Sequence, residues 1–267
     1  MSYLQEKLNS DPANFGSAEQ EQIIKEHYNS IATLVQAFAV GKTTKRGLIV
    51  NGPNGGGKTE VVKHTLDLSE STYHVVNGSM TAPQLFIKLY KHARKPNQIL
   101  VIDDTDVVLE DTEMCDILKA AIDTAPDKTV DYAKTNSAAL RMENVPTRFV
   151  CKGRVILVSN KVMSIADMST RQRQSIKPVR DRCMYVPAGL TPQWTAVAMV
   201  VLYKNNMIRC FNESSLDTSV KETILKFLVK EVAHFPGLSF RTLITCMDMY
   251  KISKKNWRNL VIMDQGV

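Results

Sequence analysis

The sequence lacks the features that define several large classes of protein. Its five cysteines are odd in number and include no C-x-x-C pair, which indicates neither a zinc site nor a disulfide framework. The longest apolar run, Ala196–Tyr203, is far shorter than the roughly 20 residues that a membrane-spanning helix needs. The first residues contain no apolar segment typical of a secretion signal. We therefore expect a soluble protein that has no membrane contact and stays in the cytoplasm.

The composition is otherwise that of an ordinary globular protein. Of the 267 residues, 44% are hydrophobic and 23% are charged, which excludes a disordered chain and supplies a sizeable core. The formal net charge is +7. This charge is compatible with a nucleic-acid partner, but a phosphate-handling enzyme or a chain with solvated basic faces has the same excess.

Apolar runs that alternate with helical spacing predict an α/β domain with a mainly parallel sheet. The runs with the character of buried strands are Gly47–Asn51, Tyr73–Asn77, Gln98–Ile102, Arg154–Val158 and, more weakly, Cys183–Val186. Segments with helical spacing, such as 84–94 and 114–124, supply the crossovers that parallel neighbours need. We expect an N-terminal helical segment and linker at 1–46, the α/β domain at 47–187, and a small all-α lid domain at 188–267.

The first predicted strand leads directly into a match to the P-loop pattern G-x-x-x-x-G-K-[ST]. The matching residues, with the one that follows, are Gly52, Pro53, Asn54, Gly55, Gly56, Gly57, Lys58, Thr59 and Glu60. Glycines allow consecutive backbone N–H groups to surround phosphate oxygens, and the start of the following helix adds its positive dipole end. In this pattern Lys58 faces the β- and γ-phosphates and the Thr59 hydroxyl ligates Mg²⁺. The sequence therefore predicts a site for ATP and Mg²⁺.

Two carboxylates follow the third predicted strand. Asp103 and Asp104 stand at its carboxyl end, where parallel sheets bind their ligands. The pair resembles a Walker B element, in which the first acid holds Mg²⁺ and the second polarises the attacking water. Asp104 stands where that element usually has a glutamate, and its side chain is one methylene shorter, so we expect slow hydrolysis. Asp106 is a further candidate that could share the second role.

Three more residues, in chain order, make the sequence similar to the AAA+ ATPases. Asn160 ends the fourth predicted strand and resembles sensor 1, which orients the hydrolytic water. Arg182 directly precedes the fifth strand and resembles the arginine that acts in a neighbouring subunit's site, with Arg180 as the alternative. Arg241 resembles sensor 2, at the start of a helix in the lid domain. The resemblance covers most of residues 20–250 and implies a ring, commonly a hexamer, with ATP at the subunit joints.

Within AAA+, the sequence is most similar to a group of ATPases encoded by tailed bacteriophages. The segments that carry this likeness are Tyr73–Met80, Asp103–Asp106, Leu118–Thr124, Val145–Phe149 and Leu238–Leu243. The resemblance implies that the protein works in the cytoplasm of an infected bacterium. It does not fix a cellular process, although DNA replication is one that it favours.

The sequence leaves the load of such an ATPase open. Residues 125–154 form a longer segment than a simple crossover between strands requires. Basic residues surround Tyr132 in this segment. They would contact the phosphates of DNA while the tyrosine stacks on a base. This favours a motor or loader that acts on DNA or on a replication component. The alternative is a remodelling or nucleotide-gated scaffold ATPase that acts on a phage or host protein. For that alternative, the loop Asn77–Pro83 has no aromatic residue to hold a protein substrate. Met80 is a weaker candidate for this contact. A monomeric P-loop kinase is a third, weaker alternative.

Overall fold

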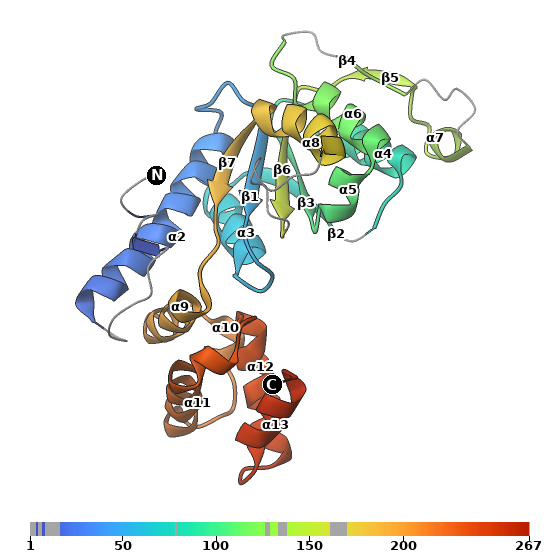
Figure 1. Cartoon of the computed structure of the whole chain (residues 1–267). Helices are drawn as coiled ribbons and strands as arrows, with labels where there is room; N and C mark the ends of the chain where they lie inside the picture. The colour runs from blue at the N-terminus through green and yellow to red at the C-terminus, as the bar shows by residue number, and fades with distance from the viewer. Residues whose placement is uncertain are drawn as a thin grey trace. The chain divides into compact units, whose positions relative to one another are not determined.

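The chain forms two compact units in the computed structural model, which describes residues 4, 7–8, 17–77, 79–125, 129–132, 138–160 and 170–266 (Figure 1). The first unit comprises the described parts of residues 31–52 and 58–188. The second comprises the described parts of residues 1–30, together with residues 53–57 and those from 189 onward. The long helix α2 (Ala18–Ala39) contributes to both units.

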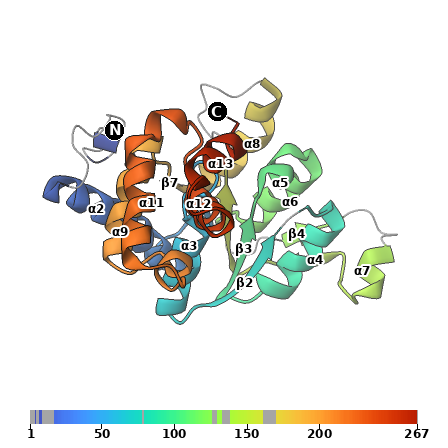
Figure 2. The same cartoon turned by 90° about the horizontal axis from the view of Figure 1, so that it is seen from below.

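A parallel five-stranded sheet forms the centre of the first unit (Figures 1 and 2). Its strands are β1 (Gly47–Asn51), β2 (Thr72–Asn77), β3 (Gln98–Asp103), β6 (Arg154–Ser159) and β7 (Cys183–Pro187), in the spatial order β2-β3-β6-β1-β7. Every neighbouring pair is parallel, so the predicted sheet and its predicted strands are confirmed. All residues of β1 are buried, which agrees with its apolar sequence and its position between two other strands.

Helices in the crossovers bury their apolar faces against this sheet. They are α3 (Lys58–Leu68), α4 (Ala82–His92), α5 (Asp106–Glu110), α6 (Thr112–Ala121) and α8 (Thr170–Arg182). Phe86 of α4, Leu118 of α6 and Val179 of α8 share one core with strand residues such as Leu100. The sequence spacing predicts α4 and α6 two residues too late, because their capping residues Thr81 and Asp111 fix where they begin.

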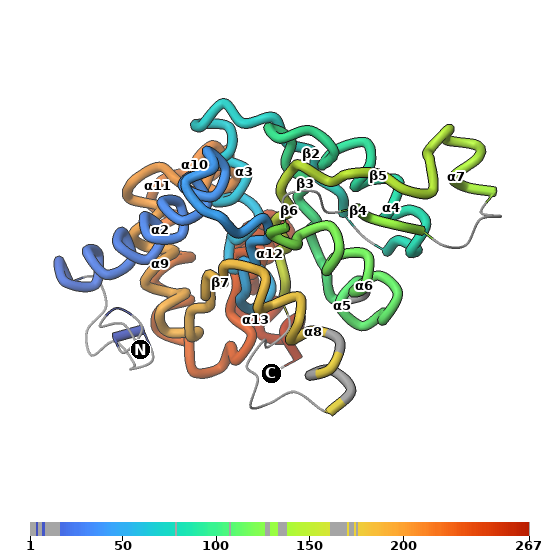
Figure 3. Tube along the Cα trace, turned by 90° about the horizontal axis from the view of Figure 1, so that it is seen from above, coloured from blue at the N-terminus to red at the C-terminus, as the bar shows by residue number. Residues whose placement is uncertain are grey.

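Between α6 and β6 lies a small antiparallel pair of strands, β4 (Thr129–Asp131) and β5 (Arg148–Val150), with the short helix α7 (Ala138–Met142) between them in sequence. Figure 3 shows these elements beside α4. The Phe86 ring of α4 lies 5.5 Å from that of Tyr132 and 5.0 Å from that of Phe149. Aromatic packing therefore anchors the pair of strands to α4.

The second unit is helical from residue 189 onward. It contains α9 (Pro192–Lys204), α10 (Arg209–Asn212), α11 (Thr218–Lys230), a 3₁₀ turn η1 (Val232–His234), α12 (Phe240–Ile252) and α13 (Trp257–Asp264). Its core is built around Phe211, Phe235 and Trp257. No helix in the described ranges combines the length and the apolar character required to cross a bilayer.

Two histidines stack on each other where α4 covers the edge strand β2. The rings of His74 and His92 are 3.7 Å apart and nearly parallel, with 8° between their planes. Burial lowers the pKa of both imidazoles from the usual 6.5, and the positive charge of Lys88 lowers both further. Because the folded pKa lies below the unfolded one, the unfolded state binds more protons as pH falls through about 6.5. The contribution of the two neutral imidazoles to the free energy of unfolding is therefore complete above that pH and is lost below it.

We expect the free energy of unfolding to fall between pH 7.5 and pH 5.5, and to fall less in a His74→Gln/His92→Gln variant. Urea denaturation at the two pH values measures the difference. Replacement of the exposed His64 with glutamine is the matched control for the substitution itself. An unchanged pH dependence in the double variant would contradict the assignment to this pair.

Candidate nucleotide site

The glycine-rich loop joins the end of β1 to the first residue of α3, so it begins at the carboxyl end of that strand. Gly55 and Gly57 have φ angles of +70° and +76°, in the left-handed region that other residues adopt only at a cost. Within the second unit, the Gly55 carbonyl accepts a hydrogen bond of 3.0 Å from the backbone N–H of Phe240. A Cβ at Gly55 would lie 2.5 Å from the Cβ of Ser239, so the contact itself requires a glycine.

Lys58, Asn160 and Asp104 form one hydrogen-bonded chain. The buried Lys58 Nζ donates to the Gly52 carbonyl at 2.9 Å and to Asn160 Oδ1 at 2.8 Å. Asn160 Nδ2 in turn donates to Asp104 Oδ1 at 3.0 Å. These three predicted site residues come from α3, from the end of β6 and from the end of β3. They meet because β3 and β6 are neighbours and β1 lies on the other side of β6.

Thr59 and Asp103 form the second part of the site. The Thr59 hydroxyl lies 2.9 and 3.0 Å from the two carboxylate oxygens of Asp103. A hydroxyl and a carboxylate are the hard oxygen donors that Mg²⁺ uses when phosphate oxygens and water complete its shell. No group of three or more His, Cys, Asp or Glu side chains suited to a metal occurs in the part of the chain that the structure describes. The pair thus fits an Mg²⁺ ion that arrives with a phosphate ligand.

Asp104 has a backbone that favours aspartate over the usual glutamate. Its φ angle is +60°, and its own N–H donates to Asp103 Oδ1 at 3.1 Å. Aspartate enters this left-handed region more readily than residues with longer side chains. Asp106, the alternative, begins α5 and accepts a 3.0 Å hydrogen bond from the Ser159 hydroxyl. The carboxylate in direct contact with Asn160 is therefore that of Asp104.

The predicted arginines lie outside this hydrogen-bonded group. Arg182, the last residue of α8, is 39% exposed and its Nε donates to Asp123 Oδ2 at 3.3 Å. The guanidinium of Arg180 stacks on the Tyr185 ring, 4.7 Å from its centroid. Arg241 is exposed in the first turn of α12, in the second unit. Glu60, Pro53 and Asn54 are exposed as well, the first in the opening turn of α3 and the others in the loop.

The residues of 125–154 that were expected to contact DNA differ in their exposure. Tyr132 is only 5% exposed and packs on Phe86, so the prediction that it stacks on a base is wrong. Arg148 forms an ion pair with Asp131, and that pairing raises the pKa of its guanidinium. Arg154 is part-buried, with its guanidinium 5.2 Å from the Phe38 ring and a 3.0 Å hydrogen bond to the Lys45 carbonyl. Arg141 and Lys152 are exposed, and Lys128 and Lys134 lie outside the described residues.

No model of a known protein family matches the chain, and no curated protein matches it. Solved structures do match. A point mutant of Thermotoga maritima RuvB is 13% identical, with 97% of this chain and 76% of that chain covered and a TM-score of 0.53. The chain has the fold of an AAA+ P-loop ATPase. A structure of T. maritima RuvB described as a Holliday junction branch migration motor is 13% identical. The match covers 97% of this chain and 72% of that chain, with a TM-score of 0.46. A structure on katanin self-assembly gives 14% identity over 94% and 77%, with a TM-score of 0.42.

In this AAA+ fold two further residues, neither of them predicted from the sequence, connect strand ends next to the site. The Tyr185 hydroxyl of β7 donates to Asn51 Oδ1 at 3.0 Å, and Asn51 Nδ2 donates to the Ser159 carbonyl at 3.2 Å. Asn51, the residue before the P-loop, is thereby bonded to the residue before Asn160. The sequence gives one signal for Asn51, a polar side chain at the end of an otherwise apolar strand. For Tyr185 it gives none.

Proposed function

We propose that the protein binds ATP with Mg²⁺ at residues 52–60 and hydrolyses it to ADP and phosphate. The observation that supports this most directly is the hydrogen-bonded chain from Lys58 through Asn160 to Asp104, beside the pair Thr59–Asp103. This arrangement places a cation, two oxygen donors for a metal and a carboxylate acceptor at the end of a glycine-rich loop. Each is a group that phosphoryl transfer requires.

In the proposed mechanism each side chain has one task. Lys58 and the loop N–H groups bind the phosphates, and Thr59 with Asp103 would hold Mg²⁺. When bound, Mg²⁺ neutralises charge on the phosphate oxygens. Asp104 accepts a proton from the attacking water while Asn160 orients that water. Arg182 of an adjoining copy and Arg241 of the lid domain, residues 188–267, stabilise charge on the γ-phosphate.

We further propose that copies assemble as a ring, most simply a hexamer, because an arginine that acts in trans has no use in a monomer. The sequence likeness to ATPases of tailed bacteriophages supports work in the bacterial cytoplasm. For the load, a motor or loader on DNA or a replication component remains one candidate. The burial of Tyr132 and the ion pair of Arg148 with Asp131 favour the other, a remodelling or scaffold ATPase that acts on a protein.

Replacement of Asp104 with alanine is expected to leave ATP binding intact and to lower kcat at least about a hundredfold, the usual value of a positioned general base. Phosphate release and nucleotide affinity, measured on the same preparation, separate the two effects. Asp106→Ala is the control for the alternative acid, and we expect it to retain most of the activity. Full turnover by the Asp104 variant, or transfer of phosphate to a small molecule instead of water, would contradict the proposal.

A further inference from the structure

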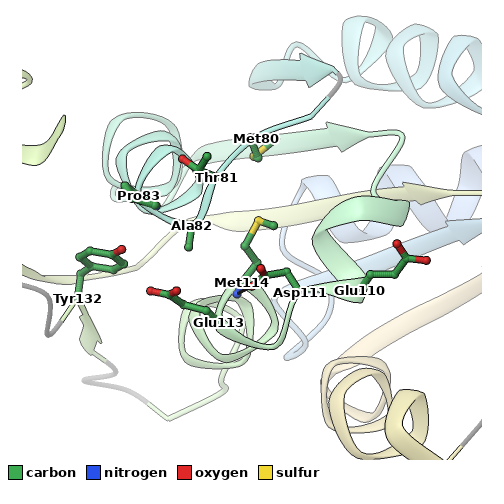
Figure 4. Close-up of a pocket in the computed structure, with 9 residues that line it drawn as sticks. All are labelled: Met80, Thr81, Ala82, Pro83, Glu110, Asp111, Glu113, Met114 and Tyr132. Carbon is green, nitrogen blue, oxygen red and sulfur yellow. Dashed lines mark hydrogen bonds between the residues drawn. The ribbon is translucent and has the colours of Figure 1, made fainter.

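A hollow of about 600 Å³ lies in the first unit and uses none of the predicted nucleotide-site residues. It is formed by the residues that lead into α4, by the junction of α5 and α6, and by the residue after β4 (Figure 4). Its lining residues are Met80, Thr81, Ala82, Pro83, Glu110, Asp111, Glu113, Met114 and Tyr132. Its size is within the range of pockets that hold a few side chains of a partner.

One part of the lining is apolar and adaptable. Met80 packs against the core cluster of the unit, and Met114 is buried. Pro83, which is half-buried, adds further apolar surface. Methionine side chains are flexible and polarizable, so they fit partner side chains of several shapes. This part of the hollow is suited to aliphatic groups.

The other part is acidic. Glu110, Asp111 and Glu113 come from the α5–α6 side of the hollow, across from residues 80–83 (Figure 4). None of the nine lining residues within the described part of the chain is basic, although the whole chain has a net charge of +7. Asp111 accepts a hydrogen bond of 2.8 Å from the N–H of Met114, so this carboxylate also caps α6. Glu110 is the exposed last residue of α5.

We propose that this hollow binds a protein segment in which lysine or arginine alternates with aliphatic residues. The cationic groups pair with the three carboxylates and the aliphatic side chains contact Met80 and Pro83. A nucleic acid is disfavoured at this surface, because its phosphates would meet negative charge. The inference rests on the alternative function, in which the ATPase acts on a protein, and specifies the class of that protein partner. The binding needs no ATP turnover, so its failure would leave the proposed ATPase activity untouched.

Fluorescence anisotropy with a labelled hexapeptide of alternating leucine and lysine tests the proposal on the full chain. The variant Glu110→Gln/Asp111→Asn/Glu113→Gln removes the charge and keeps the shape, and asparagine still caps a helix. We expect about tenfold weaker binding or more, from the loss of charge-assisted pairs. The variant Glu26→Gln/Glu222→Gln/Asp264→Asn changes the net charge equally at exposed positions elsewhere. It should weaken binding by less than about twofold, because salt screens distant charges.

A second variant tests the apolar part of the hollow. Met80→Ala should weaken binding of the leucine–lysine peptide more than binding of a serine–lysine peptide of the same charge. Three results would overturn the proposal: no binding of the leucine–lysine peptide, equal losses in the two charge variants, or no difference between the two peptides. Binding of a single-stranded 20-nucleotide DNA would overturn it too, if the peptide displaces this DNA and the same carboxylates are needed to bind it.

Discussion

Lys58→Ala is expected to abolish ATP binding, with an affinity at least about a thousandfold lower, because several charge-assisted bonds to phosphate are lost together. Lys58 is the first residue of α3, where its charge adds to the positive end of the helix dipole. A cation at this end is unfavourable for the helix alone and favourable for binding an anion. The variant should therefore fold as stably as the wild type while losing the ligand.

Thermal unfolding with and without ATP and Mg²⁺ measures both properties in one experiment. A ligand that binds only the folded state raises Tm, so the wild type should show a shift and Lys58→Ala should show none. Lys63→Ala, in the same helix, is the matched control and should keep the shift. A normal shift in the Lys58 variant would show that the loop does not bind the triphosphate.

The elements that position the site could be predicted because local sequence determines them. Strand β1 is an unbroken apolar run that ends in glycines, and β3 is one that ends in Asp103. Parallel strands present their carboxyl ends at one edge, so this pattern also indicates that the P-loop and Asp103 lie near each other. The contacts between Lys58, Asn160 and Asp104 required the additional facts that β6 has β3 on one side and β1 on the other.

Contacts that depend on distant packing could not be predicted. Tyr185 and Asn51 are 134 residues apart, and their hydrogen bond follows from the pairing of β7 with β1. Tyr132 appears in the sequence as an aromatic residue among basic ones, but the ring of Phe86 in α4 gives it a buried partner. The backbone φ of +60° at Asp104, which suits aspartate, likewise has no signal in the sequence. Each of these needed the three-dimensional neighbour to be known.

Arg182→Ala is expected to lower kcat about a thousandfold or more while ATP still binds, the effect typical of an arginine supplied in trans. In the folded chain, Asp123 and the Pro178 carbonyl, at 3.3 and 3.0 Å, hold this guanidinium at the end of α8. Arg180→Ala is the matched variant, because Arg180 stacks on Tyr185 in the same last turn of the helix. The variant with the larger loss of kcat identifies the arginine that acts in trans. Arg182→Lys should not restore activity, because lysine lacks the planar fork of donors.

Mixing subunits separates this role from a merely structural one. In the proposed ring, Arg182→Ala copies lack the donated guanidinium at every joint, and Asp104→Ala copies lack the carboxylate at every joint. In a mixed ring, a joint with Asp104 from one copy and Arg182 from the other has both groups, so phosphate release should partly recover. A subunit that had lost activity through misfolding could not complement its neighbour. If Arg182→Ala hydrolyses ATP normally, or if Arg180→Ala is the variant that complements, the trans role does not belong to Arg182.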